Sequence, residues 1–256
     1  GFLGGDRTSL DLPAAQEKLM EAVIETGKPV IVVLMNGGAL SVNKAQEKAA
    51  AILLAGYPGQ QGGNAVADVL FGDYNPAGRL PVTYYKSVDQ LPSFEDYNME
   101  GKTYRYFRKD PLYAFGYGLS YTTFSYTNLV VPEKAVAGEK IKVKVTVTNT
   151  GSRQGDEVIQ LYLNDEKAST PRPARQLEGF ERISLKPGES KDVEFELDPR
   201  QFSIINNKNK RVIEPGYFNI SVGGKQPGFS GYLDPQFTQT VTGRLRLTGK
   251  AVEFPN

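Results

Sequence analysis

The pattern of apolar and polar positions changes its period about half-way along the chain. Up to about residue 90, apolar residues recur at helical spacing or stand in short unbroken runs, whereas beyond about residue 121 they alternate with polar residues. Helical spacing predicts amphipathic helices, unbroken runs predict buried strands, and alternation predicts strands with one buried face. The two halves are therefore expected to belong to different structural classes.

The first half is predicted to alternate helices with strands. Helices are expected at 12–26, 42–50 and 64–71, and strands at 29–35 and 51–55. Asp11 is the expected N-cap of the first helix, and Gly27 and Gly72 are expected at the ends of the first and third. This order predicts part of an open α/β sandwich sheet, with strands buried on both faces. Two or three strands are too few for such a sheet to be stable alone, so this half is expected to be incomplete.

The second half is predicted to be all β. Apolar and polar residues alternate at 141–148, 192–197, 218–222 and 244–247, while 158–163 is more evenly apolar and suits a central strand. Turn-forming residues separate these runs. About seven short strands of this kind predict a β-sandwich of the immunoglobulin or fibronectin type III class.

Between the halves lies a segment that follows neither period. Residues 80–119 are rich in Tyr and Phe, interleaved with charges, Gly and Pro. A long connection of this kind is usually functional or packed against another part of the protein. The predicted division of the chain is therefore 1–90 for the α/β part, 91–120 for an aromatic-rich connector and 121–256 for the sandwich.

Composition excludes several functional classes. The chain has 39% hydrophobic and 23% charged residues, as globular proteins do, and a net charge of +1 gives no reason to expect a nucleic-acid partner. No apolar run is long enough to span a membrane. Because the chain has neither Cys nor His, it offers no thiolate nucleophile, no Ser-His-Asp triad and no Cys or His metal ligands. Acid–base chemistry would fall to Asp, Glu, Lys or Tyr, and no metal or cofactor is expected.

Three dense motifs carry a family resemblance. They are GGDRTSLDLP at 4–13, YPGQQGGNAVADVLFGDYNPAGRLPVT at 57–83 and PLYAFGYGLSYTTF at 111–124. In this order they resemble the C-terminal half of glycoside hydrolase family 3, the β-glucosidases and β-xylosidases. The resemblance covers nearly the whole chain.

The resemblance implies an exo-acting retaining β-glycosidase that removes terminal β-D-glucosyl or β-D-xylosyl residues from oligosaccharides or aryl β-glycosides. Family members carry an aspartate nucleophile on an N-terminal (β/α)8-type barrel, followed by an α/β sandwich and often a fibronectin type III-like domain. Their acid/base glutamate lies shortly before the segment that matches 4–7. Both catalytic carboxylates are therefore expected outside this chain, on a barrel-bearing N-terminal segment or a second chain. Localisation is not fixed by the sequence, and the resemblance implies a periplasmic or secreted protein.

One acidic pair, Glu95 and Asp96, invites a catalytic interpretation. Retaining glycosidases hold two carboxyl groups about 5–5.5 Å apart, but adjacent residues point in different directions and acidic pairs are common on surfaces. We therefore assign no catalytic residue to this chain and expect it to be inactive alone.

Six residues are candidates for contact with a sugar: Asp6, Arg7, Asp96, Tyr97, Tyr104 and Arg105. Asp6 and Arg7 either border the sugar pocket or form an ion pair or backbone cap. The aromatic residues either stack on sugar rings or belong to the core. The glycine-rich loop at 59–63 lacks the Lys-Ser/Thr ending of a phosphate-binding loop, so it is interpreted as a tight turn before a helix.

Two other functional interpretations stay open at this point. One is a non-catalytic carbohydrate-binding or structural module, which an exposed row of aromatic residues on the sandwich would favour. The other is a natural two-chain enzyme whose barrel is a separate polypeptide. The connector sequence at 94–97 resembles the xylosidase branch more than the glucosidase branch, by analogy only.

Overall fold

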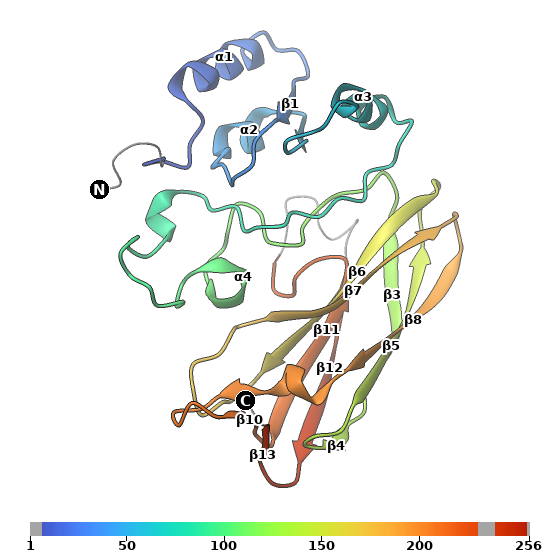
Figure 1. Ribbon diagram of the computed structural model, residues 1–256. Coiled ribbons are helices and arrows are strands. Elements are labelled where there is room, and N and C mark those ends of the chain that lie inside the picture. Colours follow the sequence, from blue (N-terminus) through green and yellow to red (C-terminus); the bar gives the residue numbers. More distant parts are fainter. Residues whose placement is uncertain (1–6, 230–238, 255–256) are drawn as a thin grey trace.

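The computed structural model describes residues 7–229 and 239–254 (Figure 1). It has an α/β part at the N-terminal end, a β-sandwich at the C-terminal end, and the connector between them. The predicted fold class, a partial α/β sheet followed by a fibronectin type III-like sandwich, is confirmed.

The α/β part contains three helices and two strands, in the predicted order: α1 (Ala14–Ile24), β1 (Ile31–Leu34), α2 (Asn43–Lys48), β2 (Ala51–Leu54) and α3 (Gly62–Phe71). The strands β1 and β2 pair in parallel, with Ile31 opposite Ala51. Gly27 and Gly72 both adopt positive φ angles, of 73° and 83°, which suits residues just beyond a helix end.

The predicted N-cap of the first helix is wrong. Pro13 occupies the N-cap position of α1, and no side chain caps it. Asp11 lies two residues earlier, where its Oδ2 accepts a hydrogen bond from Ser9 Oγ at 2.7 Å and its backbone N–H donates to the same hydroxyl at 3.0 Å. This local turn competes with capping, as short polar side chains often do.

The prediction that both faces of the α/β strands are buried is also wrong. Ile31 is 48% exposed, and α1 buries none of its residues, with Leu19 and Val23 both exposed. With only two strands among the described residues, the helices cover little of the sheet. The local core is built from one strand residue, the 40–45 segment, Tyr84 and one connector residue: Leu34, Leu40, Val42, Ala45, Tyr84 and Leu112.

The connector has its own short elements and a paired backbone. It contains α4 (Thr103–Tyr106), and η1 (Val88–Gln90) lies directly before the connector. Residues 80–84 run antiparallel to 113–117, with Leu80 N donating to Tyr117 O at 2.9 Å and Tyr84 N to Tyr113 O at 2.9 Å. In Figure 1 this pair of extended segments runs between the α/β part and the sandwich.

The sandwich consists of a five-stranded sheet packed on a three-stranded one. The larger sheet has the order β4-β12-β11-β6-β7 and the smaller the order β3-β5-β8. Their bounds are β3 (Phe124–Val130), β4 (Lys134–Val136), β5 (Ile141–Asn149), β6 (Gly155–Asp165), β7 (Gln176–Leu185), β8 (Ser190–Leu197), β11 (Gly216–Gly223) and β12 (Thr240–Thr248). A helical turn and a small sheet complete it, with η2 (Pro199–Phe202), β9 (Ile204–Ile205), β10 (Arg211–Ile213) and β13 (Val252–Phe254).

The predicted central strand at 158–163 is confirmed as part of β6, which lies between β11 and β7. Ile159 and Leu161 point into the sandwich core. Gln160 and Tyr162 point to the other face and are also buried, because the connector covers them. This second covered face explains why β6 lacks the alternation seen in its neighbours.

Candidate functional site

A cavity of about 720 Å³ opens at the carboxyl end of β1. The carboxyl ends of parallel strands are where ligands bind in open α/β sheets. Its walls come from the segment that precedes α1, from the end of β1 and from the loop after it: Arg7, Thr8, Ser9, Asp11, Leu12, Pro13, Gln16, Val33, Leu34, Met35, Asn36 and Leu40. Ser41 N donates to Leu10 O at 2.8 Å, which holds the first segment against the loop.

Arg7 is the predicted site residue at this cavity. Its side chain is exposed, and Nη2 donates to the Ala39 carbonyl at 2.9 Å. Arg7 thus fastens the N-terminal segment to the loop after β1. Asp6 lies outside the described residues.

Gly37, in the loop after β1, lies against the ring of Tyr57. A Cβ at Gly37 would overlap that ring, so a larger residue there would require the exposed Tyr57 side chain to move. The Tyr84 hydroxyl beneath the loop is partly buried, which raises its pKa, while a hydrogen bond with Asn36 lowers it in part. Among the described lining residues, Asp11 is the one carboxylate, and it already accepts a hydrogen bond from Ser9 Oγ.

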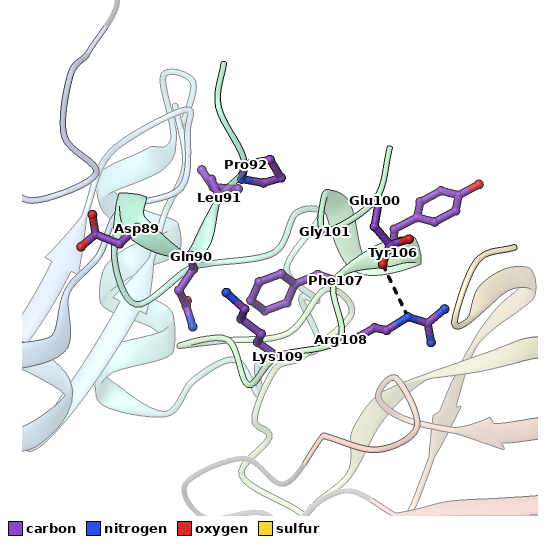
Figure 2. Close-up of a pocket in the computed structure, with 10 residues that line it drawn as sticks. All are labelled: Asp89, Gln90, Leu91, Pro92, Glu100, Gly101, Tyr106, Phe107, Arg108 and Lys109. Carbon is purple, nitrogen blue, oxygen red and sulfur yellow. Dashed lines mark ion pairs between the residues drawn. The ribbon is translucent and has the colours of Figure 1, made fainter. Parts of the chain in front are cut away.

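A second cavity, of about 350 Å³, lies between η1 and α4 (Figure 2). In Figure 2 the Phe107 ring lies at the centre of the residues that line this cavity. The ring packs edge-on against Tyr85, with centroids 5.0 Å apart. Glu100 and Arg108 form an exposed ion pair at its rim, with Oε1 and Nε 3.8 Å apart. Figure 2 shows Asp89 on the opposite side from Glu100, pointing away from the Phe107 ring. The two acids are not arranged as a catalytic pair.

Asp96 and Tyr97 lie on an exposed loop of the connector. Tyr97 is 92% exposed and its neighbour Phe94 is 72% exposed. Asp96 Oδ1 accepts hydrogen bonds from Asn98 N and Nδ2, at 2.9 and 2.8 Å, and these bonds lower the pKa of Asp96. A carboxylate held ionised in this way is suited to binding or to turn formation and not to proton donation.

Tyr104 and Arg105 lie on α4 and face the sandwich. The Tyr104 ring stacks on Phe115 at a centroid distance of 4.1 Å, and its hydroxyl accepts a hydrogen bond from Leu177 N at 3.2 Å. Arg105 Nη2 donates to Gln176 Oε1 at 2.6 Å. These two side chains therefore build the junction between connector and sandwich.

The five candidate residues that the structure describes are thus not gathered into one pocket. Arg7 lines the cavity at β1, Asp96 and Tyr97 lie on the exposed loop, and the α4 pair lies in the junction. Their contact with a substrate stays a prediction.

The sequence analysis missed a buried acid in the junction. Glu157 Oε2 lies 2.8 Å from Arg79 Nη2, and its Oε1 accepts a hydrogen bond from the Tyr126 hydroxyl at 2.6 Å. Burial raises the pKa of Glu157, although the Arg79 charge opposes this. Alternation in β6 carried no signal for it, because Glu157 occupies a core-facing position where an apolar residue is expected.

Two further properties of the described part of the chain bear on function. Residues 7–229 and 239–254 contain no cluster of three or more acidic side chains able to hold a metal ion. None of the helices in those ranges is long and apolar enough to cross a membrane.

The sequence matches two domain families in succession. Residues 3–121 match the glycosyl hydrolase family 3 C-terminal domain, and residues 157–226 match the fibronectin type III-like domain. The chain belongs to glycoside hydrolase family 3. The first match includes both the α/β part and the connector.

Similar proteins are glycosidases of greater length. A periplasmic β-glucosidase of Salmonella typhimurium is 45% identical over 85% of this chain, and a β-xylosidase of Formosa agariphila is 47% identical over 86%. The chain spans 30% and 31% of these two proteins. A solved β-glucosidase of Erythrobacter marinus superposes with a TM-score of 0.82 and 38% identity, covering 97% of this chain and 32% of that one.

Proposed function

We propose that this chain is the C-terminal part of an exo-acting retaining β-glycosidase. The observation that carries the proposal is the similarity of 85% or more of the chain to β-glucosidases and β-xylosidases. The aspartate nucleophile and the acid/base glutamate then come from a barrel-bearing segment or a second chain. The nucleophile would form a glycosyl-enzyme, while the glutamate protonates the leaving oxygen and later activates water.

In this proposal the chain supplies a wall of the substrate site and a scaffold for it. Arg7 borders the cavity at the carboxyl end of β1, with Asp6 beside it in sequence. Tyr97 and Asp96 reach the substrate edge from the exposed loop, where an aromatic face suits the apolar face of a sugar ring. Tyr104 and Arg105, on α4, support this edge of the substrate site from the junction with the sandwich.

The exposed apolar side chains of the α/β part support a packing partner. Leu19 on α1 is 66% exposed, Ile31 on β1 is 48% exposed and Met35 after β1 is 65% exposed. Large exposed apolar patches mark surfaces that are covered in the assembled protein. The proposed occupant is the part of the enzyme that carries the catalytic acids.

We also propose a class of substrate and a location for the enzyme. The substrate is a terminal β-D-glucosyl or β-D-xylosyl residue, and the proposal does not choose between the two sugars. A periplasmic or secreted location follows the periplasmic β-glucosidase among its relatives.

Turnover of chromogenic β-glucoside and β-xyloside by the purified chain tests the proposal. We expect no turnover by the 256-residue chain alone, and activity when it is joined to a barrel-bearing segment. Robust turnover by the chain alone would refute the assignment of both catalytic acids to another segment. Mass spectrometry of the native protein would show whether that segment is the same polypeptide.

The carbohydrate-binding alternative has less support. Large exposed aromatic residues of the described sandwich are scattered: Phe180 is on β7, whereas Tyr217 is on β11. The Tyr217 ring is moreover covered by Arg244, whose guanidinium carbon lies 3.8 Å from its centroid. A flat aromatic platform for sugar is therefore not formed there.

A further inference from the structure

The helix α4 is too short to be stable by its own hydrogen bonds. It has four residues, Thr103–Tyr106, and isolated helices need several turns before they persist in water. It also begins under strain, because Thr103 is β-branched and has a φ angle of 54°. Some other part of the molecule must hold this turn in place.

The segment that leads into β7 supplies the missing hydrogen bonds. Carbonyls in the last turn of a helix lack partners inside the helix. Arg175 Nη1 donates to Tyr104 O and Phe107 O, each at 3.2 Å, and Ala174 N donates to Arg105 O at 2.6 Å. Three carbonyls of α4 and the residue after it are thus capped from the sandwich, 68 or more residues away in sequence.

The cap itself is anchored to the sandwich. Ala174 O accepts a hydrogen bond from Asn164 Nδ2 at 2.8 Å, which ties the segment to the end of β6. Burial lowers the pKa of Arg175, and the Arg108 charge lowers it further. A half-buried guanidinium hydrogen-bonded to backbone carbonyls fixes geometry well, because its planar fork loses little freedom per bond.

The capped turn carries the exposed aromatic loop on its N-terminal side. The loop runs from Pro92 to Lys102 and includes Phe94 and Tyr97, both highly exposed. Near its base, Lys102 N donates to Met99 O at 3.0 Å, Lys102 Nζ donates to Asp96 O, and Thr103 N donates to the Tyr85 hydroxyl at 3.1 Å. On its other side α4 continues into Phe107, which lines the cavity in Figure 2.

We propose that Arg175 is a positioning residue, which caps α4 from the sandwich and thereby orders the 92–102 loop and the cavity beside it. The sandwich then has a task beyond packing: it presents the connector in one conformation. Any effect of Arg175 on substrate binding rests on the proposed function, which puts Tyr97 at the edge of the substrate site.

The test of ordering needs no substrate. The chain contains no tryptophan, so Tyr97→Trp gives a single fluorescent reporter on the loop. In this background we expect Arg175→Met, which keeps a long apolar stem but no donors, to lower the reporter's steady-state anisotropy. Hydrogen exchange at Tyr106 and Phe107, whose amides close the α4 turn, should become about tenfold faster or more.

Two variants keep this test decisive. Arg182→Met removes another sandwich arginine, one that pairs with Asp156 at the surface, and should change neither readout. Arg175→Lys keeps the charge and should restore exchange only in part, and it replaces Arg175→Met as the test variant if that protein does not fold. Unchanged exchange and anisotropy in folded Arg175 variants would overturn the inference.

Kinetics of the whole enzyme separate this inference from the proposed function. With chromogenic β-glycosides, Arg175→Met should raise KM several-fold with a much smaller change in kcat. Faster exchange without a change in KM would leave the cap established and would reject Tyr97 as a substrate contact. If hydrogen exchange at Tyr106 and Phe107 were as slow in Arg175→Met as in the parent protein, the cap would be rejected whatever the kinetics showed.

Discussion

Arg79 shows how one side chain joins the two parts of the molecule. It lies in the long motif at 57–83, where its Nη1 donates to Ala77 O and Gly78 O, each at 3.2 Å. It also reaches the sandwich, with Glu157 at 2.8 Å and Gly224 O at 3.1 Å. Both members of the ion pair are almost fully buried, with 8% and 1% of their side chains exposed. A buried pair of this kind adds little net stability, but breaking it is costly, because the remaining charge stays buried.

We predict that Arg79→Met destabilises the chain by about 3–5 kcal/mol, because ionised Glu157 would lose its cation. Urea unfolding followed by circular dichroism measures this. Adding Glu157→Gln should recover part of the loss, since the amide carries no charge. Lys142→Met removes an exposed partner of Glu194 and serves as the control, with little change expected. A stability of Arg79→Met equal to that of the control would contradict the prediction.

Among the elements, the β5–β8 pair carries a set of exposed ion pairs. Lys140, Lys142 and Lys144 on or just before β5 contact Glu196, Glu194 and Asp192 on β8, at 2.6, 3.1 and 2.7 Å. These strands were predicted from their alternation, and their charged face is exposed to solvent. The longer edge strands β3 and β7 were not located from the sequence. The short strands β4, β9, β10 and β13 were missed as well, because segments of two or three residues carry too little periodicity.

The pH dependence of stability should report on this face. Hydrogen bonds from Lys144 and Thr146 lower the pKa of Asp192 below its ordinary 3.8. The ionised carboxylate therefore stabilises the fold above that pH, and this contribution is lost as the pH falls through the lowered pKa. We expect Asp192→Asn to flatten this part of the stability profile in urea titrations. Salt at about 1 M should weaken the effect in the wild type, because it screens exposed pairs. Parallel profiles of wild type and variant would show that the pair contributes nothing.

At the scale of the whole molecule, the two ends are packed unequally. The sandwich has a continuous core between its two sheets, with Val143, Val145 and Leu161 fully buried. The α/β part instead exposes Leu19, Ile31 and Met35 over a two-stranded sheet. The described part of the chain is therefore a well-packed β-sandwich joined to an α/β part with an uncovered apolar side.

We predict that Leu19→Lys leaves the melting temperature of the chain unchanged and lowers its binding of an apolar dye such as ANS. The side chain is already 66% exposed, so little packing is lost. Leu34→Ala is the contrast, because Leu34 is 7% exposed and its truncation should cost about 2–5 kcal/mol. If Leu19→Lys unfolded the chain as readily as Leu34→Ala, α1 would be part of the core, against the structure.

The sequence by itself determined the class of each half, the positions of the main helices and strands, and the family. These follow from local periodicity, glycine placement and dense motifs, all of which are properties of neighbouring residues. Tertiary structure decided the rest: that Glu157 is buried opposite Arg79, that Tyr104 and Arg105 turn toward the sandwich, and that Arg175 caps α4. Each of these joins residues about 70 or more positions apart, and the packing of the whole chain, unlike local periodicity, fixes which distant groups meet.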